Sequence, residues 1–139
     1  VRRNLLRSMQ SLESSELKGV IPKVAEMFAD EDRYVRIQAV RVIRAAGPAG
    51  VEVVPALIKA LSDERTEIIR ESAWTLDALG PEQAEKALPE LLNYLSVETS
   101  SLGYDTLSAV EAVMVTIGEP AIPSLTEMLS NNTWTNKLN

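Results

Sequence analysis

The chain contains no histidine and no cysteine. Their absence removes the commonest general base, the commonest metal ligands and the thiol nucleophile, and it excludes a disulfide framework. The sequence also has no glycine-rich phosphate loop and no nucleophile elbow. We therefore predict no catalytic residue, no metal site and no cofactor, and we expect that the protein is not an enzyme.

Carboxylates are present, and one group of them follows helical spacing. Glu64, Glu67 and Glu71 stand three and four residues apart, with Arg70 close by. Residues at these steps lie on one side of a helix, and charges of both signs are typical of a side that faces water. We interpret the three glutamates as a solvated helix face and not as an acid–base pair.

Aromatic residues are also scarce, at 4% of the chain, although 45% of its 139 residues are hydrophobic. The core must therefore be aliphatic, which fits the packing of helices on helices in one domain. No apolar run is long enough to span a bilayer, and Val1-Arg2-Arg3 does not lead into the apolar core of a signal peptide. The compartment stays open, with a cytoplasmic location favoured.

A unit of two amphipathic helices is recognisable in residues 53–80. Its first helix carries Val54, Leu57, Ile58 and Leu61 on one stripe, and its second carries Ile68, Ile69, Ala73, Leu76 and Leu79. Ser62-Asp63 offers oxygens that can accept hydrogen bonds from free N–H groups where the second helix begins. Gly80-Pro81 then ends that helix. The unit is a helical hairpin.

The hairpin repeats along the chain. Pro22, Pro55, Pro89 and Pro123 are separated by 33, 34 and 34 residues, each within the first turns of a predicted helix. Gly47, Gly80 and Gly118 close three second helices, and the third repeat has a longer loop at Val97–Tyr104 that either contacts a partner or is merely solvated.

This period predicts an all-α fold, an α-solenoid of antiparallel helical hairpins with about 33–34 residues per repeat, formed by a single domain over residues 1–139. The predicted parts are a second helix of a truncated repeat (2–13), repeat 1 (16–47), repeat 2 (50–80), repeat 3 (82–118) and a partial repeat 4 (119–139). Because solenoids normally finish in polar capping repeats, we expect the chain to be a fragment of a longer protein whose uncapped ends can self-associate.

These units resemble HEAT repeats, and among them the short subclass of phycobilisome lyase subunits. The resemblance covers roughly residues 5 to 131. It is carried by Val35-Arg36, Val40, Ile43 and Ala45-Ala46-Gly47 in the first unit, by Ile68, Ala73, Leu76 and Gly80 in the second, and by Gly118-Glu119-Pro120-Ala121-Ile122-Pro123-Ser124-Leu125. The third unit departs from the pattern at Thr106-Leu107, and its Glu111 stands where Val40 and Ala73 stand. The resemblance implies a right-handed solenoid whose second helices line a concave face.

Rows of residues on that face follow from counting back from each closing glycine. Six residues before it stand Arg41, Trp74 and Ala112; three before it, Arg44, Asp77 and Val115; ten before it, Ile37, Arg70 and Ser108. Tryptophan and arginine are enriched where binding energy concentrates. One interpretation is a shallow basic groove with Trp74 as its anchor, which binds an acidic or mixed peptide or a partner's helix. Its predicted residues are Arg33, Arg36, Arg41, Arg44, Arg70, Trp74 and Asp77. In the other interpretation, Trp74 covers the core and the arginines solvate the rim.

Charge is divided unevenly along the chain, and the distribution makes some candidate functions more favourable than others. Residues 1–47 carry nine Lys/Arg and six Asp/Glu, a balance of +3, while residues 48–139 carry five and fourteen, a balance of −9. Nucleic-acid binding needs many phosphate contacts, so a DNA-binding or repair role is the least favoured. The favoured function is a non-catalytic scaffold that binds a protein partner. The alternative implied by the resemblance is a subunit of a phycobilin-type chromophore lyase.

Overall fold

The computed structural model describes residues 1–96 and 103–131, and within these ranges the chain forms helices and no strand. The α-helices are α1 (Arg2–Met9), α2 (Ser14–Leu17), α3 (Ile21–Glu26), α4 (Arg33–Ala46), α5 (Val54–Ala60), α6 (Thr66–Leu79), α7 (Pro81–Glu85), α8 (Leu88–Ser96), α9 (Tyr104–Ile117) and α10 (Ile122–Ser130). Short 3-10 helices, η1 (Met27–Ala29), η2 (Gly47–Val53) and η4 (Glu119–Ala121), join some of them.

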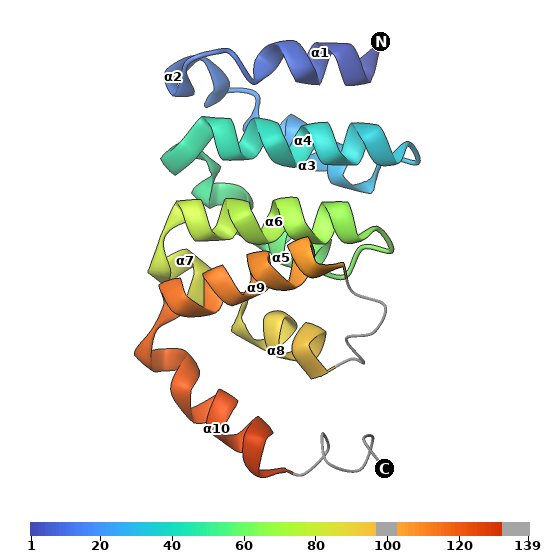
Figure 1. Cartoon of the computed structure of the whole chain (residues 1–139). Helices are drawn as coiled ribbons and strands as arrows, with labels where there is room; N and C mark the ends of the chain where they lie inside the picture. Colours follow the sequence, from blue (N-terminus) through green and yellow to red (C-terminus); the bar gives the residue numbers. More distant parts are fainter. Residues whose placement is uncertain (97–102, 132–139) are drawn as a thin grey trace.

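The helices are stacked in two layers (Figure 1). Helices α1, α4, α6 and α9 follow one another in the front layer, where α4 contacts α1 and α6, and α6 contacts α9. Behind them lie α3 and α5, which pack against α4 and α6, and α8, drawn below α9 in the view, continues this second layer and contacts α9. We refer to the exposed side of the front layer as the front face. The predicted all-α solenoid is confirmed.

Glycine ends each of the three long helices of the front layer, as the sequence predicts. Gly47, Gly80 and Gly118 have φ angles of 58°, 96° and 69°. Backbone in this region is strained for residues with a Cβ atom, so glycine lets the chain turn sharply out of the helix. The turn returns the chain to the back layer, where a new helix begins.

The core between the layers is aliphatic. Its large, fully buried side chains include Ile43, Leu57, Ile68, Leu76 and Leu91, which come from α4, α5, α6 and α8. Among the described residues, Tyr94 is the aromatic residue buried in the main core cluster. The side chain of Phe28 is partly buried and packs against this cluster. Helix α10, at the far end of the stack, contributes no buried residue. Burial is therefore concentrated in the middle of the chain.

The predicted second helix at residues 2–13 is shorter in the structure, because α1 ends at Met9. The backbone N–H groups of Gln10, Ser11 and Leu12 donate to carbonyls three residues earlier, which is the tighter 3-10 pattern of a helix end. Glu13 then caps α2, and its N–H donates to the Glu16 carboxylate at 2.8 Å. Leu12, which has helical spacing from Leu6, is 43% exposed, whereas Leu6 is buried.

Helix α9 is as long as α4 and α6, but one position that is buried in those two helices is exposed in α9. Val40 and Ala73 are fully buried, whereas Glu111 at the same distance from the closing glycine is exposed. The positions near it keep the pattern, since Val110 and Val113 are fully buried, as Ala39 and Val42 are at the same distances in α4. A buried carboxylate without a partner would be costly, so α9 presents this position to solvent.

Two sequence predictions reach beyond the described residues. Residues 97–102 of the Val97–Tyr104 loop and residues 132–139 of the partial fourth repeat lie outside them. In the described ranges, every helix is too short or too polar to cross a membrane.

Leu76→Ala should destabilise the protein by roughly 2–5 kcal/mol, because it leaves a cavity at a fully buried site of α6, in the middle of the stack. The matched control is Leu129→Ala in α10, where the leucine is 81% exposed and truncation should cost less than about 0.5 kcal/mol. Urea denaturation followed by circular dichroism measures both. Equal losses in the two variants would contradict the placement of the core.

Candidate functional site

Trp74 lies on the front face, in the middle of α6, and is 38% exposed. The Arg70 guanidinium carbon lies 5.3 Å from the centre of the Trp74 ring, as the four-residue spacing predicts. The Arg44 guanidinium carbon, which comes from α4, lies 5.9 Å from the same centre. Both distances suit cation–π attraction. The ring is therefore bracketed by two cations from neighbouring helices and remains accessible to a ligand.

A buried carboxylate links the two helices beneath this ring. Glu71 is 2% exposed, and its Oε1 accepts hydrogen bonds from Arg41 Nε at 2.9 Å and Nη2 at 2.6 Å. Arg44 Nη1 lies 3.0 Å from Glu71 Oε2. Two arginines of α4 thus share one carboxylate of α6. Their charge is partly neutralised, and one positive charge remains on the group of three.

The expectation of a solvated glutamate face is therefore wrong for Glu71, although Glu64 and Glu67 are exposed. Helix α6 turns the Glu71 side chain toward α4, where Arg41 and Arg44 supply the counter-charge that burial demands. The spacing of the glutamates shows their positions on α6. It does not show which side of α6 faces the neighbouring helix.

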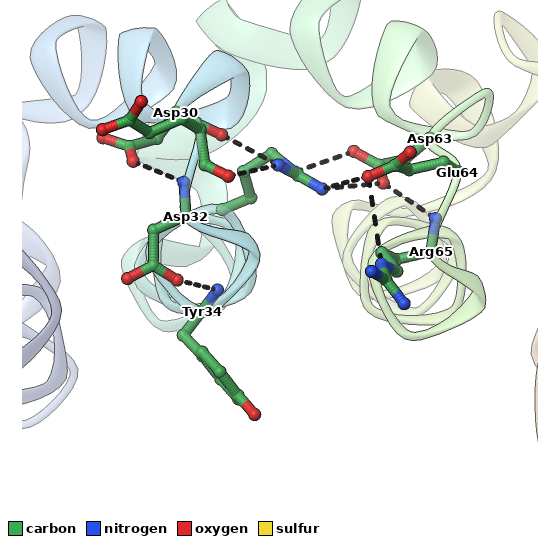
Figure 2. A network of polar contacts seen from close by, with 8 residues as sticks. Asp30, Asp32, Tyr34, Asp63, Glu64 and Arg65 are labelled. Atoms are coloured by element: carbon green, nitrogen blue, oxygen red, sulfur yellow. Dashed lines mark hydrogen bonds and ion pairs between the residues drawn. The ribbon is translucent and has the colours of Figure 1, made fainter.

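Arg36 is not on the front face. It is 9% exposed and contacts the turns that precede α4 and α6, where Figure 2 labels Asp30 and Asp63. Its Nη1 donates to the Asp30 carbonyl oxygen at 2.9 Å, and its Nε lies 3.1 Å from Asp63 Oδ2. Asp63 also accepts from the Arg65 N–H at 2.9 Å, as predicted for the start of the second helix. Arg36 therefore ties two consecutive hairpins together, a structural role.

Arg33 lies at the start of α4 beside Tyr34, which sequence reasoning missed. Its Nη2 donates to the Tyr34 hydroxyl at 2.7 Å, and its guanidinium carbon is 4.7 Å from the ring centre. This hydrogen bond is the main cause that raises the pKa of Arg33 above its ordinary value. Tyr34 is 44% exposed and stands seven residues before Arg41, on the same stripe of α4. That spacing is the signal that would have identified it.

The remaining predicted residues connect α6 to α9. Asp77 Oδ1 accepts a hydrogen bond from the Thr116 hydroxyl of α9. Arg70 Nη1 lies 3.7 Å from Asp105 Oδ2, at the start of α9. The structure thus brings Arg41, Arg44, Arg70 and Trp74 together as one surface. It leaves Asp77 at the junction with α9.

This surface offers an aromatic ring and guanidinium groups, which suit binding through contact area and charge. No cluster of three or more histidine, cysteine, aspartate or glutamate side chains within residues 1–96 and 103–131 is arranged to hold a metal ion.

Comparison with family models gives a match to the model described as HEAT repeats over residues 21–103, more than half of the chain. This range contains α3 to α8, and with them both helices that form the surface. Comparison with curated proteins gives no match.

Glu71→Gln should lower the free energy of unfolding by roughly 1–3 kcal/mol, because Arg41 and Arg44 lose their shared counter-charge. The side chains of these arginines are 36% and 38% exposed, so water compensates for part of the loss. Glu67→Gln, at an exposed position of the same helix, is the matched control. Urea denaturation compares them, and identical midpoints would show that the buried ion pair contributes nothing.

Proposed function

The chain belongs to the HEAT-repeat family, and from this premise we propose that the front face around Trp74 binds a segment of another protein. HEAT repeats generally mediate protein–protein interaction, and the family is typically a non-catalytic scaffold. We infer the same role for this chain, with no reaction of its own.

The accessible Trp74 ring is the observation that carries the proposal. Its two neighbouring guanidiniums, at 5.3 and 5.9 Å, come from Arg70 and Arg44, and each arginine is also paired with a carboxylate. Groups that are already ordered lose little conformational entropy when a partner arrives. A pre-ordered tryptophan with adjacent arginines has the composition of a binding hot spot.

The chemistry of this surface favours a partner segment that combines an apolar side chain with an acidic one. The apolar side chain would cover the Trp74 ring. The acidic side chain would receive hydrogen bonds from guanidinium N–H groups of Arg41 or Arg44 that Glu71 leaves unused, since each guanidinium has five donors. Because Glu71 neutralises one of these two arginines, selectivity for acidic groups at this surface is moderate.

The internal ion pairs also argue against nucleic acid as the partner. Arg36, Arg41, Arg44 and Arg70 each lie within 3.7 Å of a carboxylate oxygen of this chain. A DNA-binding groove depends on cations that release the counterions of phosphate groups. Arginines already neutralised by Asp63, Glu71 and Asp105 supply few such charges.

Trp74→Ala should lower the affinity for a specific protein partner by roughly tenfold or more, the loss expected for truncating a central aromatic anchor. The chain is immobilised and exposed to lysate of its source organism, and affinities of recovered proteins are then measured by calorimetry. Tyr104→Ala is the matched control, because Tyr104 is 85% exposed at the start of α9. Arg41→Glu is avoided, since it would place a second carboxylate against Glu71.

Both variants must first show the parent's circular dichroism spectrum. A partner lost from Trp74→Ala and retained by Tyr104→Ala supports the proposal. A partner that both variants bind as tightly as the parent would mean that the front face around Trp74 is not the binding surface.

A further inference from the structure

The arginines of the front face differ in whether they are paired with a carboxylate. Arg41 and Arg44 are paired with Glu71, and Arg70 with Asp105. Arg3 and Arg33 have no carboxylate within ion-pair distance among residues 1–96 and 103–131. These two residues therefore offer an anion positive charge that the paired arginines do not.

Arg3 and Arg33 bracket Tyr34. The Arg3 guanidinium carbon, from α1, lies 5.4 Å from the Tyr34 ring centre, and that of Arg33 lies 4.7 Å away. We call these three residues the Tyr34 clamp. Figure 2 shows the Tyr34 side chain pointing away from the Asp30 and Asp63 carboxylates, and 44% of the residue is exposed. The clamp therefore repeats, on α1 and α4, the arrangement of Trp74 between Arg44 and Arg70.

Two carboxylates at the turn before α4 already have partners within the chain, and Glu67 of α6 attracts Arg33 only as a minor cause of its raised pKa. Asp30 Oδ2 lies 2.8 Å from Arg2 Nη1, and its Oδ1 accepts from the Asp32 N–H at 2.9 Å. Asp32 Oδ1 accepts from the Tyr34 N–H at 2.8 Å. These contacts fix both carboxylates at the turn, so neither neutralises the guanidiniums of Arg3 and Arg33 by direct contact.

There is also room for a ligand beside the clamp. A polar hollow of about 280 Å³ opens between α1 and α4, and its lining includes Arg2, Arg3, Asn4 and Asp32. Arg33 uses one N–H for the Tyr34 hydroxyl, which leaves other donors of its guanidinium for an incoming oxygen. Each of the two guanidiniums can bind a carboxylate through charge-assisted hydrogen bonds. Arg3 lines the hollow, together with the Asp32 carboxylate, and Arg33 lies next to Asp32 in the sequence.

We propose that the Tyr34 clamp is a second subsite, which binds an acidic side chain of the protein segment held at Trp74. Tyr34 and Arg41 share one stripe of α4, so the clamp and the Trp74 surface lie on the same face. The inference rests on the proposed function for the protein nature of the ligand. It adds the position at which acidity is recognised.

The test is a titration of the ¹⁵N-labelled chain with a hexaglutamate peptide, followed by NMR. Binding should shift the Nε signals of Arg3 and Arg33 and the amide signal of Tyr34. Arg3→Gln with Arg33→Gln should weaken binding roughly fivefold or more, as expected from the loss of two exposed ion pairs. The matched control is Lys59→Gln with Lys86→Gln, two exposed lysines of the back-layer segments. Each pair removes two positive charges and takes the net charge from −6 to −8.

Three results would overturn the inference. Equal weakening in both double variants would show that only the overall charge matters. Equal displacement of the peptide by the same concentration of inorganic phosphate would contradict recognition of a carboxylate segment. Loss of hexaglutamate binding in Trp74→Ala would place the acidic subsite at Trp74. Retained binding of hexaglutamate by Trp74→Ala supports the clamp. The lysate experiment tests the Trp74 surface independently, so either proposal can fail without the other.

Discussion

Each hairpin of this protein can bury its apolar side only against the hairpins next to it, and the other features of the structure depend on that constraint. Helices α4 and α6 each have neighbours on both sides in the front layer, and they carry eight and seven buried residues. Contact between these neighbouring helices also decides which polar groups must be neutralised. Glu71 is buried because α4 covers it, and Arg41 and Arg44 accompany it for that reason.

Much of the fold could be predicted from the sequence because its signals are local. The spacing of Pro22, Pro55, Pro89 and Pro123 and the closing glycines place the helices along the chain. Apolar spacing within each helix also identifies core residues such as Leu57 and Leu76. The register of α9 is harder to predict, since Glu111 interrupts the pattern at a position where Val40 and Ala73 are buried.

The candidate site could be predicted only in part, because it depends on contacts between helices. The stacking of Arg70 on Trp74 follows from spacing on α6 alone. The pairing of Glu71 with two arginines requires the rotation of α6 against α4, and the position of Arg36 depends on how two turns approach each other. Neither is encoded in the spacing of one helix. Tyr34 lies in the first turn of α4, thirteen residues before Gly47, beyond the rows that lie three, six and ten residues before each closing glycine.

The cations beside each exposed aromatic ring come from two helices. Arg3 of α1 and Arg33 of α4 lie beside Tyr34, and Arg44 of α4 and Arg70 of α6 lie beside Trp74. A change in the packing of α1 on α4 would therefore move a cation away from Tyr34 while the ring stayed on its own helix. The charge around these rings thus depends on how closely neighbouring helices of the stack are packed, whereas the position of each ring depends on one helix alone.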